Sequence, residues 1–246
     1  MDVPVCRPVV FCVMMSTIDG KIGRRSPGAD VVDEYIDVYR MIDDTIATSS
    51  KIKGNAWMCG RVTSQLYFSD TSSDVLPLCN TVVLEGDYIA PKTNGRYFVT
   101  FDTNGILRWK KPTISFYPEH GDLNLIIIVN ESTPKEYLGY LHELGISYLI
   151  CGTESVDVAS VLTKLYTRFD IHQVLLEGGG KLNGSFIQAG LIDELYVLVV
   201  PRVLNKASEP CVFDSSEDAN SALYQFSLIE TKVMNRESVL LHYRKK

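Results

Sequence analysis

A run of glycines directly after a short apolar segment is the feature of this sequence best suited to chemistry. Gly178, Gly179 and Gly180 follow Glu177 and the apolar residues 174–176. Three consecutive glycines would lose much backbone entropy inside a regular element, so they indicate that another group approaches the backbone closely. A helix that begins after them would direct free N–H groups and its dipole at one point, which favours a phosphate. The alternative is a tight turn that only lets a helix and a strand pack closely.

A second turn of the same kind carries a cation. Gly60, Arg61 and Thr63 follow the apolar residues 56–59, and a helical pattern comes after them. A guanidinium group is suited to bidentate phosphate recognition, although an arginine after a strand is usually only a surface residue. Two glycine-led helix starts in one small sheet are better explained by one ligand with several phosphates.

Two familiar phosphate motifs do not fit the first turn. A P-loop needs Gly-Lys followed by Ser or Thr, whereas Lys181 is followed by Leu182. A Rossmann fingerprint needs a third glycine where Asn183 stands, and it normally opens its domain rather than closing it. A dinucleotide, if one binds, must therefore use another scaffold.

Polar residues also follow the first apolar run, residues 9–15. Ser16, Asp19 and Lys21 belong to the sequence Ser-Thr-Ile-Asp-Gly-Lys-Ile. The carboxyl end of a buried strand is where open α/β sheets place their ligand sites. Because Asp-Gly is also a common turn signal, a site role and a purely structural turn both remain open here.

The elements that must position these residues alternate between strands and helices. Apolar runs predict strands at residues 9–15, 56–59, 81–84, 97–101, 125–129, 146–151 and 174–176. Helical spacing predicts helices at residues 30–46, 133–144 and 155–169 and after both glycine turns. Residues 224–234 and 238–243 read as an antiparallel strand pair. The fold class is therefore α/β, with a mostly parallel sheet, an antiparallel C-terminal edge and a single domain over residues 1–246.

Composition excludes several classes of protein. The 246 residues are 46% hydrophobic and 22% charged, as in an ordinary globular protein with a sizeable core. The net charge of −6, with no compensating basic patch, argues against general nucleic-acid binding. Six scattered cysteines lack any metal spacing and indicate free thiols in a reducing compartment. With no membrane-length apolar run and no signal peptide, the sequence predicts a cytosolic protein.

The two glycine turns together resemble the paired phosphate-binding motifs of the dihydrofolate reductase fold, a three-layer α/β sandwich. The segments from Ser16 to Ile22 and from Leu175 to Leu204 are similar, more narrowly, to the reductase domain of riboflavin biosynthesis, here without a fused deaminase domain. The resemblance covers nearly the whole chain. It implies an NADPH-dependent reductase that converts a ribosylaminopyrimidine 5′-phosphate to its ribityl form by hydride transfer to C1′ of an open-chain imine.

The resemblance also implies roles for individual residues. It places the cofactor phosphates against two groups of residues: Gly60, Arg61 and Thr63, and Gly178, Gly179, Gly180, Lys181 and Leu182. Met15 and Ser16 would border the nicotinamide.

On the substrate side, Glu177 and Asp19 are the candidate acids, and either would donate a proton if partial burial raises its pKa. For Glu177, capping of the glycine-turn amides is the alternative. Ser16, Lys21 and Arg40 are candidates for substrate binding, although Arg40 is most simply a solvated partner of nearby carboxylates.

Departures from the family pattern keep other functions open. Val13 stands where the family often has a polar residue, and Tyr67 and Phe68 stand where it tends to have acids. The alternatives are a pterin- or folate-type reductase and a non-catalytic NADPH-binding protein. The pyrimidine could be reduced before or after its deamination. The resemblance further suggests a homodimer built on the antiparallel edge.

Overall fold

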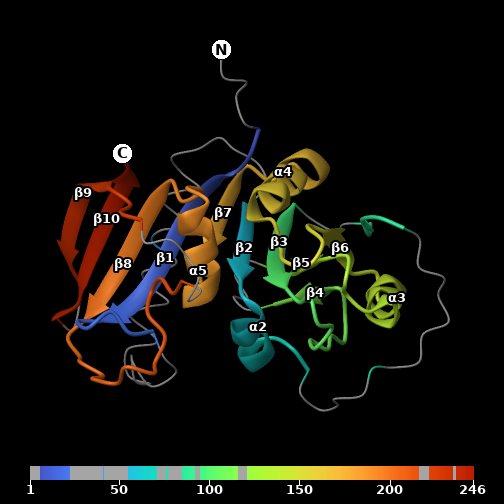
Figure 1. The fold of residues 1–246 in the computed structure, drawn as a ribbon, viewed down its shortest axis with the longest axis horizontal. Helices are drawn as coiled ribbons and strands as arrows, with labels where there is room; N and C mark the ends of the chain where they lie inside the picture. The colour runs from blue at the N-terminus through green and yellow to red at the C-terminus, as the bar shows by residue number, and fades with distance from the viewer. Residues whose placement is uncertain are drawn as a thin grey trace. The chain divides into compact units, whose positions relative to one another are not determined.

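The computed structural model describes residues 6–22, 41, 55–70, 76, 85–91, 95–115, 121–215, 222–234 and 237–246. The chain divides into two compact units (Figure 1). Unit 1 comprises residues 1–8 and 53–174, and unit 2 comprises residues 9–52 and 175–246. The expected single domain over 1–246 stays a prediction. The expected helix at 30–46 and the expected strand at 81–84 lie outside the described residues.

Unit 1 is built on a mostly parallel sheet. Its strands are β2 (Asn55–Cys59), β3 (Arg96–Phe101), β4 (Thr113–Ile114), β5 (Leu123–Val129) and β6 (Ser147–Ile150). β3 lies between β2 and β5 and is parallel to both. The far edge of β5 is shared by the antiparallel β4 at its start and the parallel β6 further along. The two-residue β4 was not predicted, because so short a pairing leaves no periodic pattern in a sequence.

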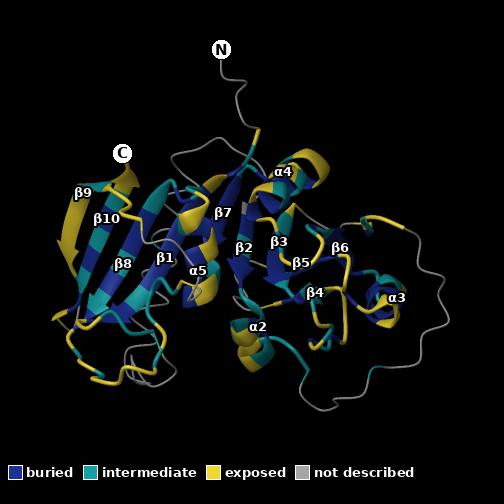
Figure 2. Ribbon diagram, in the orientation of Figure 1, coloured by how far each residue is buried: buried dark blue, intermediate teal, exposed yellow. Residues whose placement is uncertain are grey.

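Helices cover both faces of the unit 1 sheet. Its helices are α2 (Arg61–Tyr67), α3 (Lys135–Glu143) and α4 (Val158–Phe169). Alternate residues of β5, including Leu125 and Ile127, join a cluster with Tyr137 and Leu141 of α3. The opposite face carries Tyr97, whose ring meets Phe169 of α4 edge-on at 5.4 Å. Figure 2 shows β3 and β5 as buried, in agreement with their predicted apolar runs.

The predicted starts of two unit 1 helices were wrong by a few residues. Thr133 does not cap α3, because its hydroxyl donates to the carbonyl of Thr103 and accepts from the amide of Asn130. The N-cap position belongs to Pro134. The second helix, α4, begins at Val158 rather than at 155, after Asp157 accepts a hydrogen bond from the amide of Ala159.

Unit 2 contains the N-terminal strand and the C-terminal edge. Its elements are β1 (Val9–Thr17), α5 (Gly180–Gln188), β8 (Glu194–Val200), β9 (Phe226–Val233) and β10 (Val239–Lys245), together with the end of β7 (Gln173–Leu176). The strand order is β7, β1, β8, β10, β9. β1 is parallel to β8, whereas β10 is antiparallel to both β8 and β9. The predicted parallel sheet and antiparallel C-terminal pair are therefore confirmed.

Within the described residues, no helix is long and apolar enough to cross a membrane. Five cysteines in the described part of the chain, Cys6, Cys12, Cys59, Cys151 and Cys211, are free thiols. This agrees with the expectation of unpaired cysteines for those positions.

Candidate functional site

The first glycine turn links β7 directly to α5, as predicted. Gly178 adopts a φ of +78°, a left-handed conformation that favours glycine. A Cβ at Gly178 would lie 2.9 Å from both the Sδ and the Cε of Met14 in β1. The peptide bond between Gly178 and Gly179 is cis. Gly178 is therefore explained by backbone conformation and by close packing against β1.

Two further glycines are explained by a segment that crosses α5. A Cβ at Gly180 would overlap the carbonyl of Cys211 and the carboxylate of Asp214, and a Cβ at Gly184 would overlap the carbonyl of Asp214. The alternative interpretation of the sequence, in which the glycines only permit close packing, therefore holds at these positions.

Gly179 is different from its neighbours. Its φ of −70° and ψ of −170° are open to any residue. The nearest atom to a Cβ built there is the Cδ1 of Ile22, at 4.0 Å. No described part of the protein requires a glycine at this position. Among the described residues, Gly179 is thus the glycine of the turn with the most room beside its backbone.

The start of α5 is suited to an anion, with one opposing charge. Gly179 is the N-cap residue and has no side chain to satisfy the amides of the first turn. Lys181 is exposed in that turn, and residues 180–188 have no acidic side chain in the first turn. The carboxylate of Asp214 nevertheless lies beside Gly180 and accepts from the amide of Cys211 at 3.1 Å. Attraction for a bound anion is therefore weaker than an uncapped helix alone predicts.

The β1 residues next to this turn lie on one face of the strand. Cys12, Met14 and Ser16 alternate along β1 and so share a face. Met14 is the residue that contacts the turn, whereas Met15, which was predicted to border the nicotinamide, lies on the opposite face. Ser16 shares the face of Met14 and is 4% exposed. Burial and, secondarily, the nearby charge of Glu177 raise the pKa of the Cys12 thiol.

Asp19 has a lowered pKa rather than the raised one that a proton donor would need. Its carboxylate accepts from the hydroxyl of Thr17 at 2.6 Å and from the amides of Leu204 and Asn205 at 3.1 and 2.9 Å. These hydrogen bonds, that from Thr17 most of all, lower the pKa of Asp19 to about 2. The condition for proton donation is therefore not met at Asp19, because its side chain is exposed and accepts three hydrogen bonds.

Lys21 and Glu177 both belong to unit 2. The ammonium of Lys21 lies 3.2 Å from the carbonyl of Glu209 and 3.3 Å from the sulfur of Cys211. An ammonium has three N–H donors, so one remains uncommitted within the described part of the chain. Glu177 is half-buried directly after β7.

The second glycine turn has the predicted local structure in unit 1. Gly60 is the N-cap of α2, and its carbonyl accepts from the amide of Ser64 at 3.1 Å. The hydroxyls of Ser64 and Thr100 are 2.6 Å apart in the core and fix α2 to β3. Arg61 is half-buried and donates to Gln65 at 2.7 Å, one turn along the helix. Thr63, also half-buried, follows on the same helix.

The two glycine turns belong to different units, so their convergence on one ligand stays a prediction. Arg40, a candidate for substrate binding, lies outside the described residues. In the described part of the chain, no group of three or more His, Cys, Asp or Glu side chains could hold a metal ion.

Sequence reasoning missed the residues that shape the first turn from outside it. Met14, Asn183, Cys211 and Asp214 all contact the turn or the start of α5. Of these four residues, only Asn183 could have been noticed in the sequence. It is a polar residue at a position of the helix that faces the core, and a buried amide needs hydrogen-bond partners. Cys211 and Asp214 are some 30 residues away, and no local pattern links them to α5.

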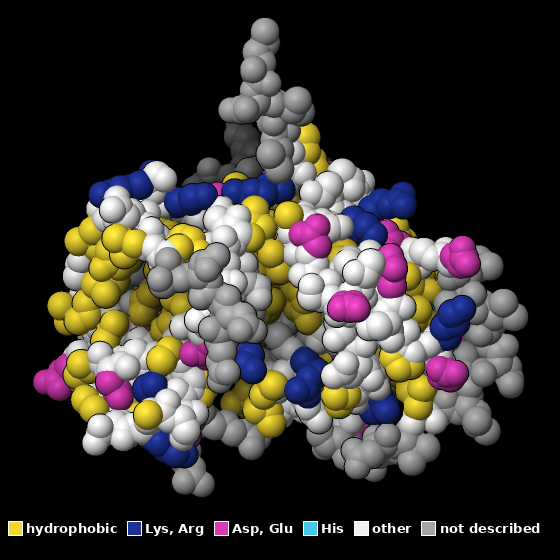
Figure 3. Space-filling view, in the orientation of Figure 1, with side chains coloured by type: hydrophobic (Ala, Val, Ile, Leu, Met, Phe, Trp, Pro, Cys, Tyr) yellow, Lys and Arg dark blue, Asp and Glu magenta, His cyan; other side chains and the backbone are white. Residues whose placement is uncertain are grey.

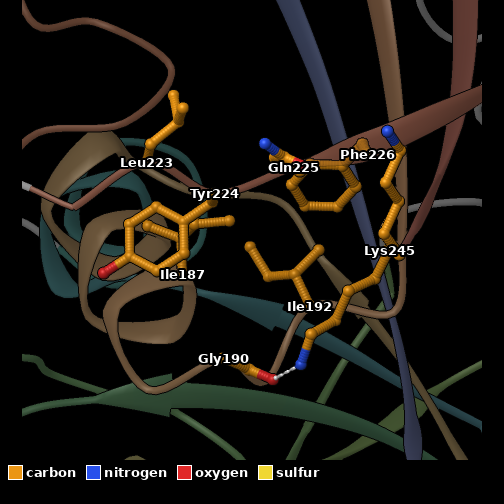
Figure 4. A pocket seen from close by; sticks show the side chains of 9 residues that line it. Ile187, Gly190, Ile192, Leu223, Tyr224, Gln225, Phe226 and Lys245 are labelled. Atoms are coloured by element: carbon orange, nitrogen blue, oxygen red, sulfur yellow. Dashed lines mark hydrogen bonds between the residues drawn. The ribbon is translucent and has the colours of Figure 1, made fainter.

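A separate apolar pocket lies at the other end of α5 (Figure 4). It has a volume of about 360 Å³ and is lined by Ile187, Gly190, Ile192, Leu223, Tyr224, Gln225, Phe226, Lys245 and Lys246. The ammonium of Lys245 donates to the carbonyl of Gly190 at 2.6 Å. None of the predicted site residues lines this pocket.

The mostly parallel sheet with an antiparallel C-terminal edge places the protein among α/β proteins with the dihydrofolate-reductase-like fold. The chain belongs to the family of the RibD C-terminal domain, whose model matches residues 117–240, half of the chain. This confirms the family that the sequence motifs resembled.

Two relatives share about a third of the aligned residues. The 2,5-diamino-6-ribosylamino-4(3H)-pyrimidinone 5′-phosphate reductase of Aquifex aeolicus is 33% identical over 85 residues, or 35% of this chain and 38% of that protein. The protein of the same name from Methanothermobacter thermautotrophicus is 34% identical over 79 residues, or 32% of this chain and 36% of that protein. The matches thus span well under half of the relatives' length.

Solved structures agree with the fold over nearly the whole chain. Acinetobacter baumannii RibD has a TM-score of 0.61 at 20% identity, covering 98% of this chain and 58% of that one. A pyrimidine reductase-like protein from Corynebacterium diphtheriae has a TM-score of 0.69 at 12% identity, covering 100% and 95% of the two chains. At these identities the likeness establishes the fold alone.

Proposed function

We propose that this protein is an NADPH-dependent reductase of a ribosylaminopyrimidine 5′-phosphate in riboflavin biosynthesis. The observation that carries the proposal is Gly179, a glycine that no described contact within the protein requires, at the uncapped start of α5. Membership of the RibD C-terminal domain family and two relatives named as pyrimidinone phosphate reductases support the substrate class. The substrate is either the 2,5-diaminopyrimidinone or the 5-aminouracil that its deamination yields.

The proposed cofactor contacts divide between the two glycine turns. The backbone around Gly178, Gly179 and Gly180, with Lys181 and Leu182 in the first turn of α5, would hold the pyrophosphate. Gly60, Arg61 and Thr63 would hold the phosphates from unit 1, with Arg61 on the 2′-phosphate. A guanidinium fits this role because it is permanently charged and can donate two parallel hydrogen bonds.

In the proposed reaction, bound NADPH supplies a hydride to C1′ of the open-chain imine of the substrate. Glu177 is the preferred acid, because its half-buried carboxyl stands at the strand end directly before the glycine turn, from which it would donate to the imine nitrogen or ring oxygen. Asp19, with its pKa lowered, is held as a carboxylate and so fixes the turn after β1 rather than donating a proton.

We assign the remaining polar groups to position substrate and cofactor. Ser16 shares the β1 face that contacts the glycine turn, so it borders the nicotinamide region together with Met14, and Met15 is the weaker candidate. Within the described residues, the ammonium of Lys21 keeps one donor that would be available to the substrate phosphate. Arg40, although outside the described residues, remains a candidate for the same phosphate.

Arg61 provides the sharpest test of the cofactor assignment. Arg61→Ala is expected to weaken NADPH binding roughly 10- to 100-fold, the loss of a charge-assisted hydrogen-bond pair. NADH binding should change far less, since NADH lacks the 2′-phosphate. Both dissociation constants would be measured by titration of nucleotide fluorescence. Equal losses for NADPH and NADH would show that Arg61 does not read the 2′-phosphate.

A turnover assay separates the reductase from the alternatives. NADPH oxidation in the presence of either ribosylaminopyrimidine phosphate supports the proposal and identifies the preferred substrate. Oxidation with dihydrofolate instead, together with inhibition by antifolates, would indicate the pterin-type reductase. Tyr67 favours testing that case, because it is an exposed ring where the family tends to have an acid. Binding of NADPH without any turnover would indicate the non-catalytic protein.

We further propose a homodimer through β9. This strand ends the strand order, and its residues from Leu228 to Val233 are all exposed. Leu228, Ile229 and Val233 are 56%, 47% and 75% exposed, and a second copy of the chain would remove these apolar side chains from water. Figure 3 shows hydrophobic side chains gathered over β9 and β10.

We also propose that the protein works in a reducing compartment such as the cytosol, since the described cysteines are free thiols.

A further inference from the structure

One segment of unit 2 joins the turn after β1 to the start of α5. This segment, residues 204–214, follows β8 and is called the strap from here on. At its first end, the amides of Leu204 and Asn205 donate to the carboxylate of Asp19. The middle of the strap pairs with the turn after β1, where Ile22 donates to the carbonyl of Pro210 at 2.9 Å. The strap is therefore fixed along the substrate side of the proposed site.

Lys21 strengthens this attachment with its side chain. Its backbone forms an antiparallel bridge with Cys211, and the amide of Val212 donates to the carbonyl of Gly20 at 3.2 Å. The ammonium then reaches along the strap to the carbonyl of Glu209 and the sulfur of Cys211. Two of its three donors are thus spent on the strap. A lysine whose only role was to bind a substrate phosphate would not need these contacts.

The far end of the strap is attached to α5. The amide of Asp214 donates to the carbonyl of Gly180 at 3.0 Å. The side-chain nitrogen of Asn183 donates to the carbonyl of Val212 at 2.8 Å. The missing side chains of Gly180 and Gly184 let the strap lie directly on the helix backbone. The strap therefore packs against the first turn of α5, which follows Gly179.

Asn183 lies between the strap and the glycine turn. It is fully buried, at 0% exposed, and its nitrogen is 3.4 Å from the position of a Cβ on Gly178. Its Oδ1 has no hydrogen-bond partner among the described residues. A buried unpaired acceptor costs about 1–3 kcal/mol, and asparagine is a poor residue for a helix interior. An apolar residue would serve better if Asn183 only filled the core.

We propose that the strap sets the position of the glycine turn, and that Lys21 and Asn183 are positioning residues that act through it. The inference rests on the proposed function, since it assigns NADPH affinity to side chains that contact the strap rather than the cofactor. It also explains why the substrate-side turn and the cofactor-side turn of unit 2 are joined: a shift of one end of the strap moves the other.

The test uses Lys21→Met, Asn183→Ala and the double variant of the full chain. Each single substitution is expected to weaken NADPH binding roughly 5- to 50-fold, as for a buried hydrogen bond lost or left unpaired. The double variant should be weakened little more than the worse single one, because both substitutions release the same segment. Hydrogen exchange of the amides of residues 178–184 should be faster in all three variants, without any ligand present.

Lys21→Met is the decisive variant, because among the described residues Lys21 bonds to the strap and to Thr17 but not to the glycine turn. If Lys21 only binds substrate, the variant raises the KM for substrate but leaves the NADPH dissociation constant and the exchange of residues 178–184 unchanged. That result would overturn the proposal. Lys21→Arg, which keeps a charged donor, should restore part of the protection from exchange.

Asn130→Ala is the matched control for a buried asparagine. Asn130 lies in unit 1, is 2% exposed, and donates to the carbonyl of Glu154 at 2.7 Å. Its replacement should lower stability without changing exchange at residues 178–184. If Asn130→Ala also speeds that exchange, the effect of Asn183→Ala is general loosening and the proposal fails. If the wild-type protein does not bind NADPH, the proposed function fails, whereas the exchange data still decide the role of the strap.

Discussion

At the scale of single residues, four glycines that look equivalent in the sequence have different structural environments. Gly178, Gly180 and Gly184 are required by atoms of the protein itself, namely Met14, Cys211 and Asp214. Among the described residues, the nearest atom to a Cβ at Gly179 is the Cδ1 of Ile22, at 4.0 Å. A glycine that packing requires is thus recognised by the atoms nearest to it, which a motif cannot reveal.

Asp19 illustrates how hydrogen bonds decide the state of a carboxyl group. The folded protein lowers its pKa from 3.8 to about 2. A group with a lowered folded-state pKa contributes stability that is fully present above the unfolded pKa. That stability is lost as the pH falls from about 4 towards 2.

Asp19→Asn is therefore expected to make the stability of the protein less dependent on pH in the acidic range. The variant should be less stable than wild type at neutral pH, because the amides of Leu204 and Asn205 lose a charged acceptor. The gap in Tm should narrow between about pH 4 and pH 2, where wild type takes up the proton. The Tm of both proteins is measured across this pH range by thermal unfolding followed by circular dichroism. Glu131→Gln, an exposed carboxyl in unit 1, is the control.

A parallel fall in Tm for wild type and Asp19→Asn over that range would contradict this assignment. It would mean that the carboxylate of Asp19 is not stabilised by its three donors in solution.

The element scale explains why α5 is built with glycines. Alanine is the better helix former by about 1 kcal/mol, so Gly184 inside α5 is unfavourable by propensity alone. A Cβ there would overlap the carbonyl of Asp214, and overpacking of this kind costs about 1–3 kcal/mol. The close packing of the strap on the helix therefore decides that residue 184 is glycine, in spite of its low helix propensity.

Gly184→Ala and Gly179→Ala should accordingly give opposite results. Gly184→Ala is expected to lower the unfolding free energy by up to about 2 kcal/mol. Gly179→Ala should change it by no more than about 0.5 kcal/mol but weaken NADPH binding roughly 5- to 100-fold, because the new methyl group occupies the open side of the turn. Urea unfolding and nucleotide titration measure the two effects. Tight NADPH binding by Gly179→Ala would show that the cofactor does not approach there.

At the scale of the whole molecule, β9 is the surface that needs explanation. Among the described strands, β9 pairs with β10 alone, and it carries exposed apolar side chains near the pocket that contains Leu223 and Phe226. Edge strands of this kind associate unless charge or proline prevents it. A second copy of the chain would bury the edge.

Ile229→Lys is expected to convert the dimer to a monomer. The side chain of Ile229 is 47% exposed in one chain, so the monomer itself should lose no more than about 0.5 kcal/mol of stability. Sedimentation velocity of the variant and wild type measures the change. Ile106→Lys, at an exposed apolar residue of unit 1, is the control and should leave the oligomeric state unchanged. A wild-type protein that sediments as a monomer would rule out the dimer.

Much of the fold could be predicted because buried strands and amphipathic helices leave periodic patterns. The runs at 125–129 and 174–176 became β5 and β7 with small changes in length, and both glycine turns lead into helices. The boundaries of α3 and α4 were less accurate, because the residues that cap them also bond elsewhere. The strand β4 left no pattern at all.

The sequence by itself therefore determined the α/β class, the family and the two glycine turns, since each depends on residues that are neighbours in the chain. Only the tertiary structure decided that Asp19 is held as a carboxylate, that Met14 rather than Met15 contacts the turn, and that Gly179 is the open glycine. Those outcomes depend on atoms brought together from residues up to about 200 positions apart, such as the amide of Asn205 on Asp19. Hydrogen bonding and packing act over a few ångströms in space, whatever the separation along the chain.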